Sequence, residues 1–265
     1  MARDSFETLL LEDKGDGVFL LSLNRPQVLN AISTQMVREL REFFIPLAYG
    51  SPDYRCLVLA GAGERAFCSG GDLKERDGMS DEKLRAQHAL IEEYAFAMAN
   101  CIVPMIAAVR GPAFAGGCEL ALSCDFIYAS TDAKFALTEV TRGIMPGAGG
   151  TQNLAAAVGE RRAKEIILTG KPFGAEQAYE WGLVNALLPP EGVVDAALET
   201  ARTIALNAPI AVRQAKKAIH YGQQTDLRTG LMLEAQIYDR MISTDDRYEG
   251  IRAFNEKRPP RFSGK

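Results

Sequence analysis

Short apolar segments alternate with amphipathic ones along the first two thirds of the chain, and this alternation limits the possible folds most strongly. Four segments have the length and apolar content of buried strands: 18–23 (VFLLSL), 56–61 (CLVLAG), 105–111 (MIAAVRG) and 126–130 (FIYAS). Helical patterns separate them, because apolar residues recur at three- and four-residue spacings after Ser33, a predicted N-cap. Strand, helix, strand in this order requires parallel pairing with crossover helices, so the sequence predicts an α/β fold.

A second helix is predicted from about Ser80 to Asn100, a short one over GCELALSCD, and another after the Gly-rich turn 146–152. From about residue 190 to the end the pattern is helical throughout, with Asp226 and Thr244 as predicted caps of the last two helices. We therefore predict an α/β core over residues 1–190 and a helical region over 191–265.

Composition excludes several classes of function. The chain has 265 residues, 47% of them hydrophobic, and a net charge of −4, which disfavours a general nucleic-acid binder. No apolar run reaches about 18 residues and the N-terminus lacks a secretory pattern, which favours a cytoplasmic protein without a membrane partner. No CxxC motif occurs, and an odd number of cysteines in apolar stretches indicates buried reduced thiols at Cys56, Cys68, Cys101, Cys118 and Cys124.

The supply of catalytic side chains is narrow. The two histidines, His88 and His220, lie in polar helical contexts, and no GxSxG elbow supplies a serine nucleophile. Histidines and cysteines are not clustered as a zinc site requires, so no metal is expected. Acid–base chemistry therefore has to fall mainly to carboxylates.

Three Gly-rich segments follow strands: SGGD (69–72), AGGCE (115–119) and PGAGG (146–150). None has the GxGxxG pattern of a dinucleotide site, and glycines of this kind often serve turns alone. Glu119 follows a glycine pair at the start of an apolar helix, and Glu139 lies 20 residues later, after a strand. Each has an ordinary alternative: a helix-terminal glutamate favoured by the helix dipole, and a solvated charge at a strand edge.

The segments ERAFCSGGDLKER, PMIAAVRGPAFAGGCELALSCDFIYA and KFALTEVTRGIMPGAGGTQ, in this order, resemble the crotonase superfamily and in particular its enoyl-CoA hydratases. The resemblance runs from LSLNRPQVLNA near the start to EGIRAFNEKRPPRF at the end. It implies a spiral of repeated ββα units with a C-terminal helical region that mediates trimerisation. It also implies the reversible addition of water across the 2,3 double bond of an enoyl-CoA thioester. SGGDLKERDGMS and EKRPPRF are similar to the methylglutaconyl-CoA hydratase branch.

The resemblance assigns the catalytic roles. The backbone N–H groups of Gly71 and Gly116 match an oxyanion hole around the thioester carbonyl, where glycine lets the backbone approach the ligand closely. Glu119 and Glu139 match two carboxylates that hold the attacking water, with Glu139 exchanging the proton that ends on Cα. Two carboxylates in one apolar pocket are expected to have separated pKa values.

The resemblance also implies the binding of the coenzyme A part of the substrate, and no separate cofactor. Arg25 and the segment from Ala66 through Ser69, Gly70, Asp72 and Leu73 match the nucleotide-binding wall. Phe254 and Lys257 match residues that reach the coenzyme A of a neighbouring subunit in a homotrimer or a hexamer built from two trimers. The alternative for Lys257 is a solvated lysine in a basic tail.

Three positions depart from the family pattern. Gln27 stands where many relatives have lysine, Ala115 replaces the first glycine of a GGGCE-type motif, and Thr138 precedes Glu139 where many relatives have proline. Two other functions remain open. An isomerase that moves the double bond on the same scaffold would not need Glu119. A non-catalytic scaffold or RNA-binding relative would use the basic end, EKRPPRFSGK.

Overall fold

The computed structural model describes residues 6–49 and 53–265. Its main sheet has the order β1-β2-β3-β4-β6-β9, in which only the β1–β2 pair is antiparallel. The strands are β1 Leu9–Asp13, β2 Val18–Leu23, β3 Cys56–Gly61, β4 Met105–Val109, β6 Phe126–Ser130 and β9 Ala186–Leu188. The predicted α/β fold with parallel strands is therefore confirmed.

The predicted strands at 18–23, 56–61 and 126–130 coincide with β2, β3 and β6. The predicted strand at 105–111 is two residues too long, because β4 ends at Val109 and Gly111 has a positive φ of 62°. That backbone conformation turns the chain out of the sheet. Beyond the turn, a second sheet with the order β5-β7-β8 is formed by β5 Pro112–Phe114, β7 Lys134–Ala136 and β8 Phe173–Gly174.

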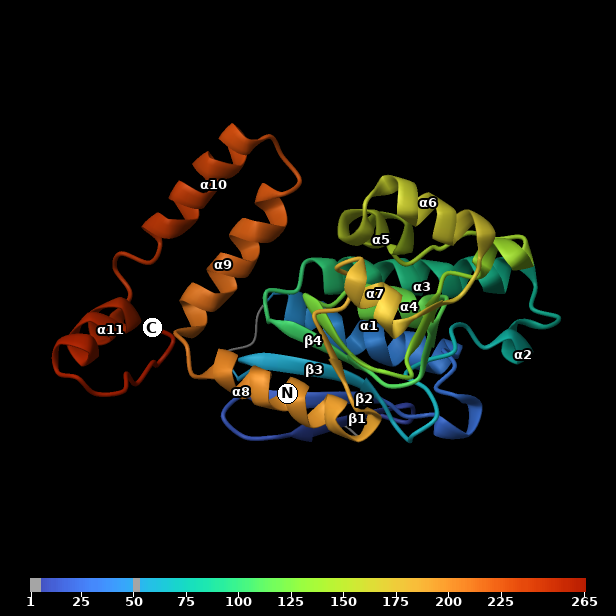
Figure 1. Ribbon diagram of the computed structural model, residues 1–265, viewed down its shortest axis with the longest axis horizontal. Helices are drawn as coiled ribbons and strands as arrows, with labels where there is room; N and C mark the ends of the chain where they lie inside the picture. The colour runs from blue at the N-terminus through green and yellow to red at the C-terminus, as the bar shows by residue number, and fades with distance from the viewer. Residues whose placement is uncertain (1–5, 50–52) are drawn as a thin grey trace.

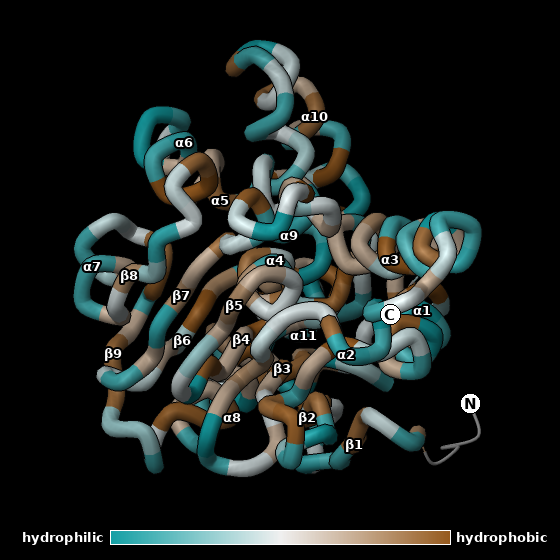
Figure 2. Tube along the Cα trace, turned by 90° about the vertical axis from the view of Figure 1, so that its right-hand side faces the viewer, coloured by the Kyte–Doolittle hydropathy of each residue, from teal (hydrophilic) through white to brown (hydrophobic). Residues whose placement is uncertain are grey.

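The two sheets arise from a repeated unit. β4 is followed at once by β5 and by helix α4 (Gly116–Leu122), and β6 is followed by β7 in the same way. Two strands of the main sheet, β4 and β6, are thus each followed by a short strand of the second sheet, as expected for ββα units. Figure 2 shows hydrophobic residues along β4, β6 and β7 and hydrophilic residues on the outer turns of α7 (Ala175–Glu180).

Helices cover both faces of the main sheet (Figure 1). Helix α1 (Thr34–Ala48) packs beside α3 (Asp81–Ala99) on one face, and α8 (Val193–Ala205) packs on the other face against β2, β3, β4 and β6. Ser33 caps α1 as predicted, because its hydroxyl accepts a hydrogen bond from Met36 N at 3.2 Å. The remaining short elements are η1 Pro26–Val28, α2 Leu73–Arg76, η2 Glu139–Arg142, α5 Gly150–Val158, α6 Glu160–Thr169 and η3 Pro190–Gly192.

The last three helices extend away from the sheets (Figure 1). They are α9 Pro209–Gly222, α10 Leu227–Asp239 and α11 Asp245–Asn255. Asp226 and Thr244 cap α10 and α11, as predicted. The division of the chain at residue 190 stays a prediction, and α8 lies beyond that point although it packs on the sheet.

The cysteines are free thiols, as predicted. Four are buried and Cys124 is half-buried. Burial raises the pKa of the Cys68 thiol to about 12, so this thiol is an inert part of the core rather than a nucleophile.

None of the helices within 6–49 and 53–265 combines the length and the apolar character that a membrane span requires.

Candidate active site

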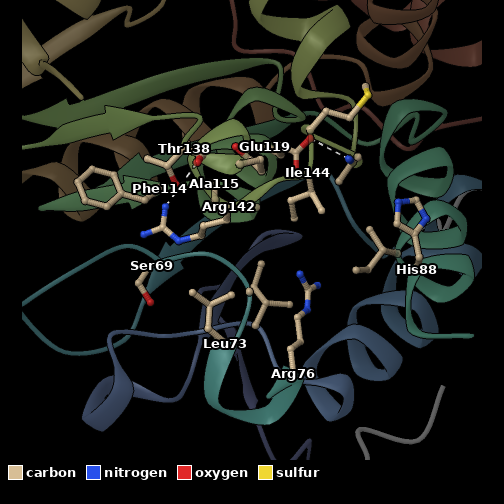
Figure 3. Close-up of a pocket in the computed structure, with 18 of the residues that line it drawn as sticks. Ser69, Leu73, Arg76, His88, Phe114, Ala115, Glu119, Thr138, Arg142 and Ile144 are labelled. Atoms are coloured by element: carbon tan, nitrogen blue, oxygen red, sulfur yellow. Dashed lines mark hydrogen bonds between the residues drawn. The ribbon is translucent and has the colours of Figure 1, made fainter. Parts of the chain in front are cut away.

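One cavity, of about 280 Å³, lies where α2, α3, α4 and the segment 138–148 meet (Figure 3). It is lined by both predicted glutamates, Glu119 and Glu139, and by both predicted oxyanion-hole glycines, Gly71 and Gly116. These four residues come from sequence positions up to 68 residues apart, so the fold collects them into one place.

Glu119 lies in the first turn of α4 and is 4% exposed. Its Oε1 atom accepts hydrogen bonds from the backbone N–H groups of Ala148 at 2.7 Å and Gly150 at 2.9 Å. Burial raises the pKa of Glu119, and the two N–H donors oppose that rise. The helix dipole alone does not explain the position of this carboxylate, because the start of α5 and the residues before it bind Oε1 and leave Oε2 for another partner.

Glu139 is the first residue of η2 and is 7% exposed. Neither of its carboxylate oxygens has a hydrogen-bond partner among the described residues. Burial raises the pKa of Glu139 to about 7, and the nearby charge of Glu119 adds to the rise. The alternative of a solvated charge at a strand edge is therefore wrong. A buried carboxyl group without a partner costs stability, which is typical of a group kept for chemistry.

The raised pKa predicts how Glu139→Gln changes stability with pH. The carboxyl group binds its proton more tightly in the folded chain, with a pKa of about 7 against an ordinary value of 4.5. The contribution of this carboxyl group to the free energy of unfolding is present below pH 4.5 and is lost as the pH rises through 7. We expect Glu139→Gln to have a melting temperature near that of the wild type at pH 5 and above it at pH 8, measured by thermal unfolding. An equal difference at both pH values would contradict this.

The two predicted oxyanion-hole glycines line the cavity and have free backbone N–H groups. Gly116 is the first residue of α4, where no carbonyl of the helix is available to its N–H. Gly71 pairs with Ile32 in a short parallel bridge. The hydrogen bonds of this bridge run from Ile32 N to Gly70 O and from Asp72 N to Ile32 O, so the N–H of Gly71 takes no part in them. No described residue accepts a hydrogen bond from the N–H of Gly71 or of Gly116. Both donors are therefore available to a ligand oxygen.

Ala115, one of the departures from the family pattern, has φ 48° and ψ −124°. This region favours glycine and strains an L-residue by about 1–3 kcal/mol. The strained residue directly precedes Gly116, so the turn that aims the Gly116 N–H is maintained against a local cost. Thr138, another departure, has φ −94° and ψ 3° at the start of η2 and lines the cavity beside Glu139. The third, Gln27, lies in η1, outside the cavity.

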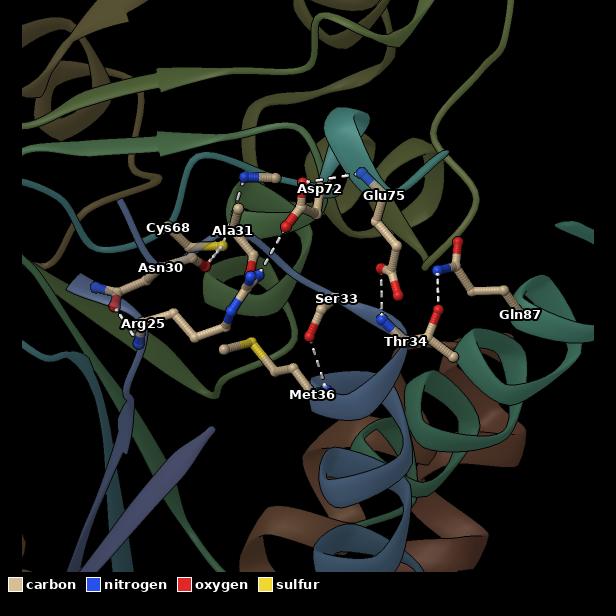
Figure 4. Close-up of polar contacts among 11 residues, drawn as sticks. Arg25, Asn30, Ala31, Ser33, Thr34, Met36, Cys68, Asp72, Glu75 and Gln87 are labelled. Atoms are coloured by element: carbon tan, nitrogen blue, oxygen red, sulfur yellow. Dashed lines mark hydrogen bonds and ion pairs between the residues drawn. The ribbon is translucent and has the colours of Figure 1, made fainter. Parts of the chain in front are cut away.

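The predicted residues of the coenzyme A wall divide into two groups. Ser69 and Leu73 line the cavity. Arg25 and Asp72 are not among its lining residues, and Arg25 donates to Asp72 Oδ2 at 2.9 Å and to Ala31 O at 2.7 Å (Figure 4). Burial would raise the pKa of Asp72, but the hydrogen bond from Arg25 holds this pKa below its ordinary value.

Ala66 is buried, and its carbonyl accepts a hydrogen bond from Asn30. Gly70 has φ 93° and turns the chain toward Gly71. Phe254, 83% exposed, lies on α11, and Lys257 follows this helix at the opposite end of the molecule from α2 (Figure 1). The coenzyme A roles of these residues, like those of Arg25 and Asp72, stay predictions.

Residues that the sequence pattern did not single out also line the cavity: Arg76, Tyr94, Arg142, Ile144 and Met145, together with His88. A signal existed for Arg76, because it lies three residues after Leu73 and so shares a helix face with it.

In the described parts of the chain, no three His, Cys, Asp or Glu side chains gather in a way that could hold a metal ion.

Comparisons with known proteins agree with this arrangement. Residues 13–265 match the sequence model of the family described as enoyl-CoA hydratase/isomerase. YngF of Bacillus subtilis, named as an enoyl-CoA hydratase/isomerase, is 43% identical, covering 97% of this chain and 99% of that protein. The mitochondrial methylglutaconyl-CoA hydratase of Mus musculus is 38% identical, covering 98% of this chain and 84% of that protein.

The fold is equally similar to solved structures. A crystal structure of an enoyl-CoA hydratase from Bacillus anthracis superposes with a TM-score of 0.94 at 43% identity, covering 98% of this chain and 100% of that one. Sequence and fold match over nearly the whole length, and the cavity contains the glycines and glutamates that the family pattern predicts. The chain belongs to the enoyl-CoA hydratase/isomerase family.

Proposed function

We propose that this protein is an enoyl-CoA hydratase, which adds water reversibly across the 2,3 double bond of an enoyl-CoA thioester. The observation that carries the proposal is the pair of buried glutamates in one cavity with opposite hydrogen bonding. Backbone N–H groups bind Glu119, whereas Glu139 has no described partner and a pKa of about 7. One group is thus suited to act as an ionised base and the other as a protonated acid.

The reaction follows from this difference. A water molecule between the two side chains gives a proton to Oε2 of Glu119 as its oxygen forms a bond to Cβ of the substrate. The electron pair of the double bond moves to Cα and the thioester oxygen, which becomes negatively charged. Glu139 then donates its proton to Cα. After one turnover Glu119 holds a proton and Glu139 has lost one, and proton exchange with solvent restores the starting state.

In this reaction the backbone N–H groups of Gly71 and Gly116 stabilise the negative thioester oxygen. They are free in the described chain, and removing one such donor in an enzyme typically costs about 10²–10³ in rate. The Gly116 N–H is at the first turn of a helix, where the peptide dipoles also favour negative charge. The reaction needs no cofactor, because the substrate carries its own coenzyme A and the thioester makes the Cα proton acidic.

The test is the absorbance of the conjugated enoyl thioester on adding purified protein to crotonyl-CoA. The proposal predicts loss of this absorbance and formation of 3-hydroxybutyryl-CoA. An isomerase would need no Glu119, so the N–H groups that position its carboxylate favour hydration over isomerisation. Double-bond migration in 3-enoyl-CoA without any hydration of crotonyl-CoA would support the isomerase instead.

The active form is proposed to be a homotrimer or a hexamer of two trimers. Large apolar side chains are exposed on the last three helices: Ile219, Leu227, Leu231, Met232, Tyr238, Tyr248, Ile251 and Phe254. Exposed apolar surface of this extent on projecting helices is typical of a protein interface.

Free thiols favour a reducing compartment, and we propose the cytoplasm.

In such an assembly Lys257 would contribute to binding the coenzyme A phosphates of a neighbouring subunit. We expect Lys257→Glu to raise KM for crotonyl-CoA with little change in kcat, because the phosphates are held similarly throughout the reaction. The increase is expected to shrink at high salt. Steady-state kinetics at two ionic strengths and light scattering check this. A fully active monomer with an unchanged KM in Lys257→Glu would contradict both the assembly and the role of Lys257.

A further inference from the structure

Arg76, at the end of α2, is held from behind by a chain of hydrogen bonds. Its Nε donates to Oε1 of Gln87 on α3 at 2.9 Å. Gln87 is only 2% exposed, and its Nε2 donates to Oγ1 of Thr34 on α1 at 2.7 Å (Figure 4). Three helices therefore fix the orientation of a single guanidinium group.

The other edge of this guanidinium faces the cavity (Figure 3). Its NH1 and NH2 atoms donate to no described residue, and Arg76 forms no ion pair within the described chain. By contrast, Arg25 and Arg258 are each paired with a carboxylate. This guanidinium is half-buried and held in one orientation, and its NH1 and NH2 groups are free. Such an arrangement can bind a carboxylate through two parallel hydrogen bonds.

The position of Arg76 indicates which part of the substrate it meets. NH1 and NH2 lie 3.1 and 3.2 Å from the point that a Cβ atom on Gly71 would occupy, so the cation lies beside the predicted oxyanion hole. Figure 3 shows Arg76 and His88 on one side of the cavity and Ser69 on the other. Ser69 and Leu73 belong to the predicted coenzyme A wall, and Arg76 lies beyond Leu73 as seen from Ser69 (Figure 3), so Arg76 is placed toward the acyl end.

The apolar surroundings strengthen the case for a charged ligand group. Ile91, Ile144 and Met145 line the same cavity, and burial raises the pKa of the neighbouring Tyr94 hydroxyl far above its ordinary value. Tyr94 is therefore neutral, and neither Glu119 nor Glu139, the two carboxylates that line the cavity, is bonded to Arg76 in the described chain. A wholly apolar acyl chain would remove water from this cation and give it no partner, which is unfavourable.

We propose that the acyl group of the substrate ends in a second carboxylate, which binds NH1 and NH2 of Arg76. The inference rests on the proposed hydratase function and names its substrate class: short 2-enoyl-CoA thioesters with a distal carboxylate. The carboxylate has to lie only a few bonds from the thioester, because the guanidinium is adjacent to Gly71. Arg76 is thus a specificity-determining residue, and Gln87 positions it.

The test compares three thioesters: glutaconyl-CoA, which ends in a carboxylate, its ω-methyl ester, and crotonyl-CoA. For the wild type we expect kcat/KM for glutaconyl-CoA to exceed that for the methyl ester by on the order of 10²-fold. In Arg76→Met this ratio falls to about one, while Arg76→Lys, which keeps the charge but loses the planar fork, gives an intermediate ratio. The matched control is Arg85→Met on α3, which removes an exposed arginine paired with Asp81 and leaves the ratio unchanged.

The outcomes separate the inference from the function on which it rests. If the wild type hydrates crotonyl-CoA and the methyl ester at least as well as glutaconyl-CoA, the inference is overturned and the hydratase function stands. This comparison needs no variant, so it holds even if Arg76→Met fails to fold. If the wild type hydrates none of the three thioesters, the proposed function and the inference both fall. An equal loss on all three substrates in a folded Arg76→Met would also overturn the inference.

Discussion

Replacing Glu139 with glutamine is expected to lower kcat for hydration of crotonyl-CoA by about 10²–10⁴-fold, the usual contribution of a general acid–base group. The carboxyl group of Glu139 is buried, has no described hydrogen-bond partner and has a pKa of about 7, so it can deliver a proton near neutral pH. Glutamine has nearly the same shape and cannot donate that proton. Steady-state kinetics with crotonyl-CoA measures the effect.

The matched control is Glu165→Gln, which neutralises an exposed glutamate on α6 and is expected to leave kcat unchanged. Binding of coenzyme A and the circular dichroism spectrum are expected to be the same in both variants and the wild type. A kcat for Glu139→Gln within about threefold of the wild type would show that Glu139 does not transfer the proton.

A second large effect is expected for Glu119→Gln, with a loss of hydration of about 10²–10⁴-fold. The amide oxygen of glutamine can still accept the hydrogen bonds that Ala148 and Gly150 donate, so the loop before α5 keeps its position. The variant lacks only the base that takes the proton from water. We therefore expect slow exchange of the Cα protons of bound butyryl-CoA with deuterated solvent to persist, because Glu139 performs that exchange.

Proton NMR of butyryl-CoA in deuterium oxide measures this exchange, and the hydration assay measures the other activity. Equal and complete loss of both activities in Glu119→Gln would indicate that the two glutamates act as one unit. Full retention of hydration would remove Glu119 from the mechanism and favour an isomerase.

The parts of the fold that were predicted from sequence are those determined by local pattern. The strands β2, β3 and β6 are continuous apolar runs, and the caps at Ser33, Asp226 and Thr244 act on neighbouring backbone N–H groups. The short strands β5, β7 and β8 have two or three residues each, too few to show a period. Their pairing depends on contacts between distant segments, which no local pattern encodes.

The same limit applies to the site. Sequence motifs identified Glu119 and Glu139, but the N–H donors of Ala148 and Gly150 are about 30 residues away from Glu119 and could not be inferred from its surroundings. The pairing of Arg25 with Asp72 spans 47 residues and was likewise not predicted. The spacing from Leu73 could place Arg76 on the same helix face, but its direction depends on the hydrogen bond to buried Gln87, 11 residues further along the chain.

The central claim is that the two glutamates add one water molecule to the 2,3 double bond. It is tested most directly by mass spectrometry of the product formed from crotonyl-CoA in ¹⁸O-labelled deuterium oxide. The account predicts 3-hydroxybutyryl-CoA that carries one solvent oxygen on Cβ and one deuterium on Cα, and no such product with Glu139→Gln in the same time. Unchanged crotonyl-CoA, or a product with a shifted double bond and no solvent oxygen, would contradict it.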